Sequence, residues 1–171
     1  MSFEEPVMAP LDIRYKGIYD LDGIYKLMRQ WFDDRKYDFM ENLYKDKVAS
    51  PFGNEVEHNM TPEILVNDFI KFHIQVITKF YDYKDFEAEI GGEKKMVSDG
   101  RFFIKLSATI EFDYQNRFKT PFQKKLLFFL IKTLLVRYYE FKYYDKLTYD
   151  LYDLQAKLKK FIKIESEYNA Y

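Results

Sequence analysis

Residues 100–114 carry the longest alternation of apolar and polar side chains in the chain. The even-numbered positions from Phe102 to Tyr114 are apolar, and most of the odd-numbered ones are polar: Lys105, Ser107, Thr109, Glu111 and Asp113. Successive side chains of a strand point to opposite faces, so this pattern predicts a long β-strand with one buried and one wetter face. A strand of this length needs neighbouring strands and an apolar cover.

The same period of two recurs in shorter stretches. In residues 70–76, four apolar side chains alternate with Lys71, His73 and Gln75, which predicts a second strand. Weaker alternations predict further strands near 11–15, 37–48 and 56–60. Gly91-Gly92 lies between two such stretches and predicts a two-residue hairpin turn.

Helical periodicity marks both ends of the chain. Apolar residues recur every three or four positions over residues 21–33, and Asp20 or Asp22 is suited to cap this amphipathic helix. Thr120-Pro121-Phe122-Gln123 has the spacing of a capping box and opens a region without Gly or Pro. Residues 126–131 are apolar all round, which predicts a helix buried against the sheet, and a break is expected within 138–145.

The last helix carries a heptad seam. Its members are spaced 4, 3, 4 and 3 residues apart: Leu147, Leu151, Leu154, Leu158 and Phe161. Two alternatives follow for these interaction residues. The seam packs within the chain, on the preceding helix or the sheet, or it meets the same seam of another copy. Because a seam this short is marginal alone, intramolecular packing is the better single expectation.

These elements together predict the fold class. We expect an α+β fold in which an antiparallel sheet of four to six strands is covered by the N-terminal amphipathic helix and two C-terminal helices. A single domain spans 1–171, with helix and sheet in 1–118 and a helical part in 119–171. An early helix, a meander of strands and a long C-terminal helix resemble helix-grip folds, which wrap an apolar ligand. That resemblance implies architecture rather than activity.

Composition and charge narrow the class of protein. The 171 residues are 47% hydrophobic, 32% charged and 20% aromatic, with 17 Phe and 16 Tyr, and large rings favour interfaces as well as cores. There is no Cys, which excludes disulfides and thiolate chemistry. Residues 119–163 hold 11 Lys/Arg against 4 Asp/Glu although the whole chain has a net charge of −1. An acidic partner could account for this asymmetry, but we expect the basic region to be neutralised within the fold or by other copies of the chain.

No targeting segment is expected. Residues 1–10 are acidic and lack an apolar run, and residues 126–136 are too short for a membrane span and interrupted by Lys132. We therefore expect a cytoplasmic protein or a component of an intracellularly assembled particle.

Candidate chemistry is sparse. If the two clearest strands are neighbours, His73, Ser107 and Glu111 supply the side chains of a nucleophile and its base. However, no loop offers an oxyanion hole, which such catalysis also needs. The solvated face of a half-buried sheet explains the same residues. His58 and His73 lack metal-ligand spacing to each other or to nearby glutamates, and no phosphate-binding glycine motif occurs. The sequence thus predicts no catalytic, metal or cofactor-binding residues and no cofactor.

A basic patch offers a nucleic-acid alternative. Its lysines are interleaved with aromatic residues: Lys124, Lys125, Lys157, Lys159, Lys160 and Lys163. Near-zero net charge and a scarcity of Arg argue against this function. The preferred hypothesis is a non-catalytic structural, assembly or protein-interaction subunit, which self-associates through aromatic-rich surfaces and the C-terminal helix. A helix-grip-like carrier of an apolar small molecule is the first alternative, and a nucleic-acid-binding protein is the second.

Overall fold

A computed structural model describes residues 3–50, 53–90 and 93–168. Within these ranges, the description leaves out the side chains of 41–50, 53, 90, 93 and 163–168. The predicted Gly91-Gly92 turn lies outside the described residues. Seven strands are present in the described part: β1 (Phe3–Pro6), β2 (Leu11–Tyr19), β3 (Glu41–Ser50), β4 (Gly53–Met60), β5 (Glu63–Leu65), β6 (Ile70–Ile90) and β7 (Glu93–Phe112). The helical segments are α1 (Leu21–Asp34), α2 (Pro121–Thr133), α3 (Val136–Tyr139), the π-helix η1 (Glu140–Tyr144) and α4 (Asp145–Tyr168).

All of these strands form one antiparallel sheet, in the order β1-β7-β6-β4-β3. β1 and β2 pair with successive parts of β7, and β5 and β4 pair with successive parts of β6. The sheet is therefore about five strands wide although it contains seven segments. The predicted α+β class with an antiparallel sheet is confirmed.

The register of β6 and β7 places the predicted alternation in the core. Ile70 pairs with Phe112 and Phe80 with Phe102, so the even-numbered residues of both strands share one face. That face is buried, whereas the face with Lys71, His73 and Glu111 is only half-buried. Burial of the large apolar side chains on one face supplies the main stabilisation of the sheet.

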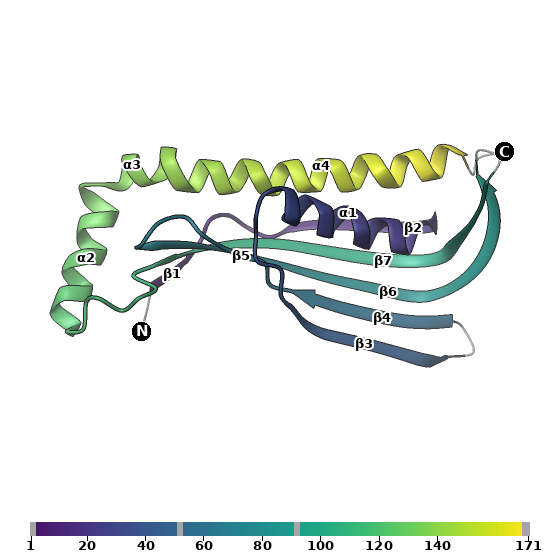
Figure 1. The fold of residues 1–171 in the computed structure, drawn as a ribbon, viewed down its shortest axis with the longest axis horizontal. Coiled ribbons are helices and arrows are strands. Elements are labelled where there is room, and N and C mark those ends of the chain that lie inside the picture. Colours follow the sequence, from purple (N-terminus) through teal and green to yellow (C-terminus); the bar gives the residue numbers. More distant parts are fainter. Residues whose placement is uncertain (1–2, 51–52, 91–92, 169–171) are drawn as a thin grey trace.

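Two helices cover the buried face. Figure 1 shows α4 running lengthwise along the sheet, with α1 on the same side. Asp20 caps α1 by accepting a hydrogen bond from the Gly23 N–H at 2.7 Å, and Ile24, Met28, Trp31 and Phe32 are buried as the periodicity predicts. Gly23 lets the two helices approach closely, because a Cβ there would lie 2.6 Å from Cζ of Phe161.

The first C-terminal helix is not where the sequence predicts it. Residues 126–131 belong to α2, which lies at one end of the sheet and turns steeply away from α4 (Figure 1). Only Ile131 of α2 is buried, because α4 already occupies the apolar face. The chain turns at Leu134 and Leu135, between α2 and α3. The break predicted within 138–145 is absent, because the helix continues there through the π-helical turn η1.

Candidate interaction surface

A buried aspartate fixes the point from which α2 starts. Asp113 has a positive φ of 53°, and its carboxylate accepts hydrogen bonds from the N–H groups of Arg117 at 2.7 Å and Phe118 at 3.2 Å. The Thr120 hydroxyl then accepts a bond from the Gln123 N–H, and the Gln123 side chain accepts one from the Thr120 N–H, each at 3.2 Å. The predicted capping box is confirmed, and it satisfies two backbone donors of the first turn.

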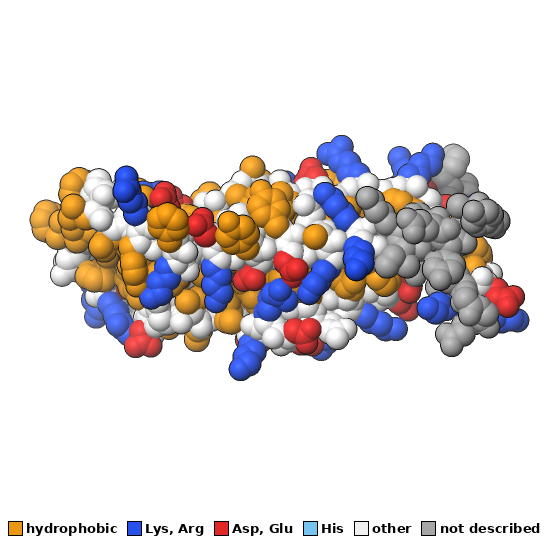
Figure 2. All heavy atoms as spheres, turned by 90° about the horizontal axis from the view of Figure 1, so that it is seen from above, with side chains coloured by type: hydrophobic (Ala, Val, Ile, Leu, Met, Phe, Trp, Pro, Cys, Tyr) orange, Lys and Arg blue, Asp and Glu red, His pale blue; other side chains and the backbone are white. Residues whose placement is uncertain are grey.

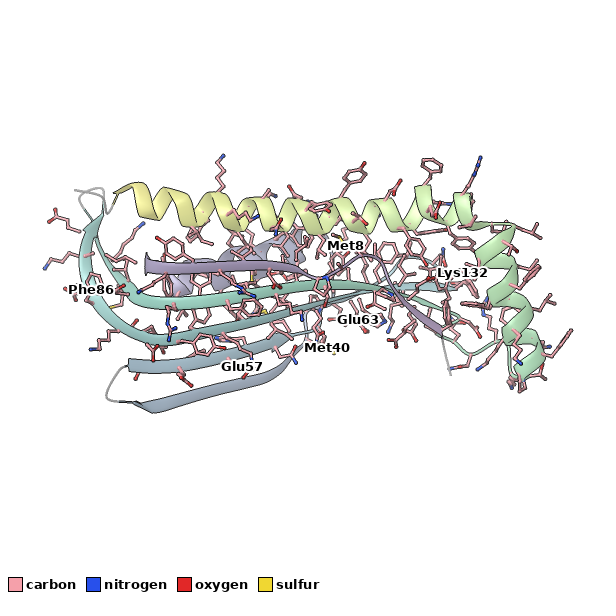
Figure 3. The ribbon with its side chains drawn as sticks, turned by 180° about the vertical axis from the view of Figure 1, so that it is seen from behind. Met8, Met40, Glu57, Glu63, Phe86 and Lys132 are labelled. Carbon is pink, nitrogen blue, oxygen red and sulfur yellow. The ribbon has the colours of Figure 1, made fainter. Side chains whose placement is uncertain are left out.

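The inner side of α2 packs on the first strand. The Phe128 ring meets Phe3 edge to face, with centroids 4.8 Å apart. Glu5 of β1 forms an ion pair with Lys132, which lies on the side of α2 facing the sheet (Figure 3), and accepts a hydrogen bond from the Tyr144 hydroxyl. Burial raises the pKa of Tyr144 to about 12, with a smaller contribution from Glu140. Glu5 therefore links both α2 and η1 to the sheet.

The outer side of α2 carries large apolar side chains with no cover in the described part of the chain. Phe122, Leu126 and Phe129 follow one another at i, i+4 and i+7, and they are 75%, 47% and 58% exposed. Residues at this spacing share one helix face. A helix that is apolar all round is normally buried on every side. The prediction that residues 126–131 are buried against the sheet is wrong for Leu126 and Phe129, which form an outward apolar stripe with Phe122, although Ile131 is buried.

This stripe continues past the turn between α2 and α3. We call the whole set the aromatic surface; its members are Phe122, Leu126, Phe129, Leu134, Tyr138, Phe141, Tyr149 and Tyr152, all exposed. Figure 2 shows hydrophobic side chains gathered at the α2 end of the molecule and continuing along the upper side of α4. Exposed apolar patches of this kind mark interaction sites in soluble domains.

The π-turn sorts the neighbouring tyrosines into inner and outer groups. Tyr143 is buried, its hydroxyl accepts a hydrogen bond from the Asn67 amide at 3.2 Å, and its ring meets Phe72 edge to face. Phe141, two residues earlier, is fully turned to the outside. On the outside, Lys142 donates to the Tyr138 hydroxyl at 2.7 Å, a bond that raises the pKa of Lys142 and lowers the pKa of Tyr138. Lys142 thus lies against the ring of Tyr138, a member of the aromatic surface.

The predicted basic residues fall into two groups. Lys124 and Lys125 lie on α2, whereas Lys157, Lys159 and Lys160 lie near the far end of α4, at opposite ends of the molecule in Figure 1. The Lys163 side chain lies outside the described residues. Lys157 also pairs with Asp153 at 3.4 Å. The structure does not bring these lysines together into one patch.

The heptad seam lies inside the molecule. Leu147, Leu151, Leu154 and Leu158 are fully buried in the core that also contains the apolar face of β7, and Phe161 is partly buried against it. This arrangement corresponds to the intramolecular alternative. A contact with another copy through these leucines would require α4 to leave the sheet, so the exposed side of α4 is the part of the helix available to a partner.

The polar residues of β6 and β7 form an ionic network on the opposite face of the sheet. The two strands are neighbours as the nucleophile hypothesis requires, but Ser107 pairs with Gln75 and not with His73. The His73 ring instead contacts Glu111 at 2.7 Å through Nε2 and Glu63 at 3.4 Å through Nδ1. Lys71 donates to Glu63 at 2.8 Å, which raises the pKa of this lysine. These contacts link three strands, and both described ring contacts of the histidine are with glutamates.

Within the described residues, no three or more His, Cys, Asp or Glu side chains come together in a way that would hold a metal ion. None of the described helices is long and apolar enough to cross a membrane. Comparison with protein-family models and with curated protein sequences gave no significant match. The candidate function therefore depends on the chain's own geometry.

The members of the aromatic surface were missed as a group from the sequence. The periodicity of 122, 126 and 129 was visible, but it shows only that these residues share a face. The side of α2 that faces inward is set by the burial of Ile131 and by the ion pair between Lys132 and Glu5 of β1. Both depend on contacts between distant parts of the chain.

Proposed function

We propose that this protein is a non-catalytic assembly subunit that self-associates through the aromatic surface. The observation that carries the proposal is the outward stripe of Phe122, Leu126 and Phe129 on a helix whose other side contacts β1 through Phe128 and Lys132. Leaving such side chains in water costs roughly 1.5–3 kcal/mol each relative to burial. Because these side chains are already partly covered, a partner that buries them completely contributes part of that free energy.

The shape and composition of this surface suit a protein partner. The exposed rings turn a corner from α2 onto α4, so a partner must be shaped to fit two helices at a steep angle (Figures 1 and 2). Tyr138, Tyr149 and Tyr152 belong to this surface, and tyrosine is enriched at protein interfaces because its hydroxyl tolerates water.

Charge also favours a copy of the same chain. The region 119–163 is basic, while the whole chain is close to neutral, so the remainder is acidic. Each copy therefore carries both signs, and a basic α2 region of one copy is attracted to acidic regions of the next. A nucleic acid would complement only the basic region, whose lysines are divided between two ends.

Single introduced cysteines test this proposal, since the natural chain has none. Phe129→Cys and Leu65→Cys place a thiol at two apolar positions of nearly equal exposure, 58% and 59%, on α2 and on β5. We expect the rate of maleimide labelling at position 129 to fall as protein concentration rises, and the rate at position 65 to stay constant. Equal, concentration-independent labelling at both positions would contradict self-association through this surface.

A further inference from the structure

The end of the molecule opposite α2 contains a hollow that the sequence does not predict. It encloses about 400 Å³ between the first two turns of α1 and the bent ends of β6 and β7. Val56, His58, Tyr83 and Ser98 form a buried floor, whereas Asp22, Asp85 and Met96 stand at the exposed rim. A volume of this size is typical of small-molecule sites.

A β-bulge builds this hollow. The pairing of β6 with β7 shifts between Tyr81 and Lys84, and Asp82 within the bulge has a positive φ of 53° and forms an ion pair with Arg101. Gly100 allows the close approach, since a Cβ there would lie 2.8 Å from the Tyr83 Cα. Bulges bend a strand and redirect its side chains, and they are common beside binding sites.

The bulge reverses which residues of β6 face α1, while the even-numbered residues of β7 keep that side. Beyond it, Asp85 and Ser98 pair across the strands and line the hollow, while Phe86 lies on the outer side of the bend (Figure 3). The Ser98 hydroxyl donates to Asp85 at 2.5 Å, which fixes the direction of that carboxylate. The bend and this hydrogen bond together hold a carboxylate at the mouth of the hollow.

The hollow is negatively charged. Its described lining contains the carboxylates of Asp22 and Asp85 and neither Lys nor Arg. Next to it, Tyr19 pairs with Ser98 in the sheet, and its buried hydroxyl has no hydrogen-bond partner in the described part of the chain. The pKa of Tyr19 is raised by burial, with further contributions from Tyr83 and from the carboxylates of Asp85 and Asp99.

Two aromatic rings complete the site. Tyr25 of α1 and Tyr83 of β6 line the hollow from opposite elements, and the Tyr25 ring contacts the His58 ring with centroids 5.6 Å apart. Aromatic faces attract organic cations, and the attraction strengthens where water is excluded. Carboxylates at the rim add direct charge attraction.

We propose that this hollow binds a small organic cation, an ammonium group carried on a short apolar body. The rings of Tyr25 and Tyr83 contact the cationic head, Asp85 and Asp22 balance its charge, and Leu21 and Met96 contact the apolar body. This site is independent of the aromatic surface, which lies at the other end of the molecule (Figure 1).

Calorimetric titration of the full chain with benzyltrimethylammonium tests the proposal, with benzyl alcohol as the neutral counterpart. We expect the cation to bind about tenfold more tightly than the alcohol, and Asp85→Asn to weaken its binding by about tenfold, the effect of one favourable charge contact. Asp12→Asn is the matched control, because it removes the same charge from β2 outside the hollow. That variant is expected to bind as the natural chain does.

Three results would overturn the proposal: equal affinity for the cation and the alcohol, equal weakening by Asp85→Asn and Asp12→Asn, or no heat of binding at millimolar cation. If circular dichroism shows that Asp85→Asn is unfolded, Asp22→Asn takes its place, since Asp22 is exposed on the rim. Unchanged affinity in a folded Asp22→Asn would then contradict the assignment.

Discussion

At the scale of single residues, Asp153 is the clearest link between the two helices on the sheet. Its carboxylate accepts hydrogen bonds from the Trp31 indole at 2.8 Å and from Arg35 at 2.7 Å, and the Arg35 guanidinium stacks over the Trp31 ring at 4.0 Å. The indole hydrogen bond, with help from Lys157 and Arg35, lowers the pKa of Asp153. The ionised carboxylate is thus the form that stabilises the packing of α1 on α4.

This lowered pKa predicts a pH-dependent stability. A carboxyl whose pKa is lower in the folded state contributes stability above its unfolded pKa, about 3.9, and loses it as pH falls through the folded value. We expect Asp153→Asn to lower the free energy of unfolding by about 0.2–1 kcal/mol at pH 7, a small effect because the site is partly exposed. Below about pH 4 the difference should become progressively smaller. Urea denaturation of both proteins across that range measures the difference. A cost that stays constant with pH would show that the charge is not responsible.

At the scale of elements, α4 and α2 differ in what covers them. α4 buries a complete leucine seam against the sheet, whereas α2 is held through Ile131, Phe128 and the Glu5 ion pair. Two predictions follow, one for each helix.

For α4, burial predicts a large contrast between neighbouring positions. Leu151→Ala removes a fully buried side chain and is expected to lower the free energy of unfolding by about 2–5 kcal/mol. Tyr149→Ala, two residues away and 71% exposed, is expected to change it by less than about 0.5 kcal/mol in the monomer. Chemical denaturation at low protein concentration makes the comparison, and similar costs at both positions would place the seam outside the core.

For α2, the capping box predicts local rather than global loss. Thr120→Ala removes the hydroxyl that accepts a hydrogen bond from the Gln123 N–H, and we expect it to lower the stability of α2 by about 0.5–2 kcal/mol. Because α2 has few contacts with the sheet, hydrogen exchange should accelerate in 121–133 and remain unchanged in α4. Faster exchange throughout α4 would show that the two helices unfold together.

At the scale of the whole molecule, one fold holds two separate features at its opposite ends. The aromatic surface lies on α2 and along α4, and the hollow lies between α1 and the bent ends of β6 and β7. The long sheet and α4, packed on each other, connect these two features. Association at one end therefore leaves the hollow at the other end open to solvent.

The sequence predicted the parts of this fold that depend on local pattern. The alternation from Phe102 to Tyr114 identified the strand and its buried face as far as Phe112, where β7 ends and Asp113 takes a positive φ. The 3.6-residue period identified α1 with Trp31 inside. Caps at Asp20 and Thr120 were also correct, since they are set by residues within one turn. These signals require no knowledge of distant contacts.

What the sequence did not predict depends on competition between distant segments. Residues 126–131 and the leucine seam are both apolar enough to cover a sheet, and periodicity does not say which of them takes that place. The hollow likewise combines residues from α1, β4, β6 and β7, and the bulge that creates it leaves no motif. The candidate surface and the candidate site were therefore accessible only from the structure.

The mass of the protein in solution tests the central claim most directly. Sedimentation over a concentration series, on the natural chain and on Phe129→Asp with Leu65→Asp as the control of equal exposure, separates the aromatic surface from other apolar positions. We predict that the natural chain and the control rise above the 20.9 kDa of a single chain as concentration increases, while Phe129→Asp stays at that mass. A natural chain that remains at 20.9 kDa throughout, or a Phe129→Asp variant that associates as the control does, would contradict the account.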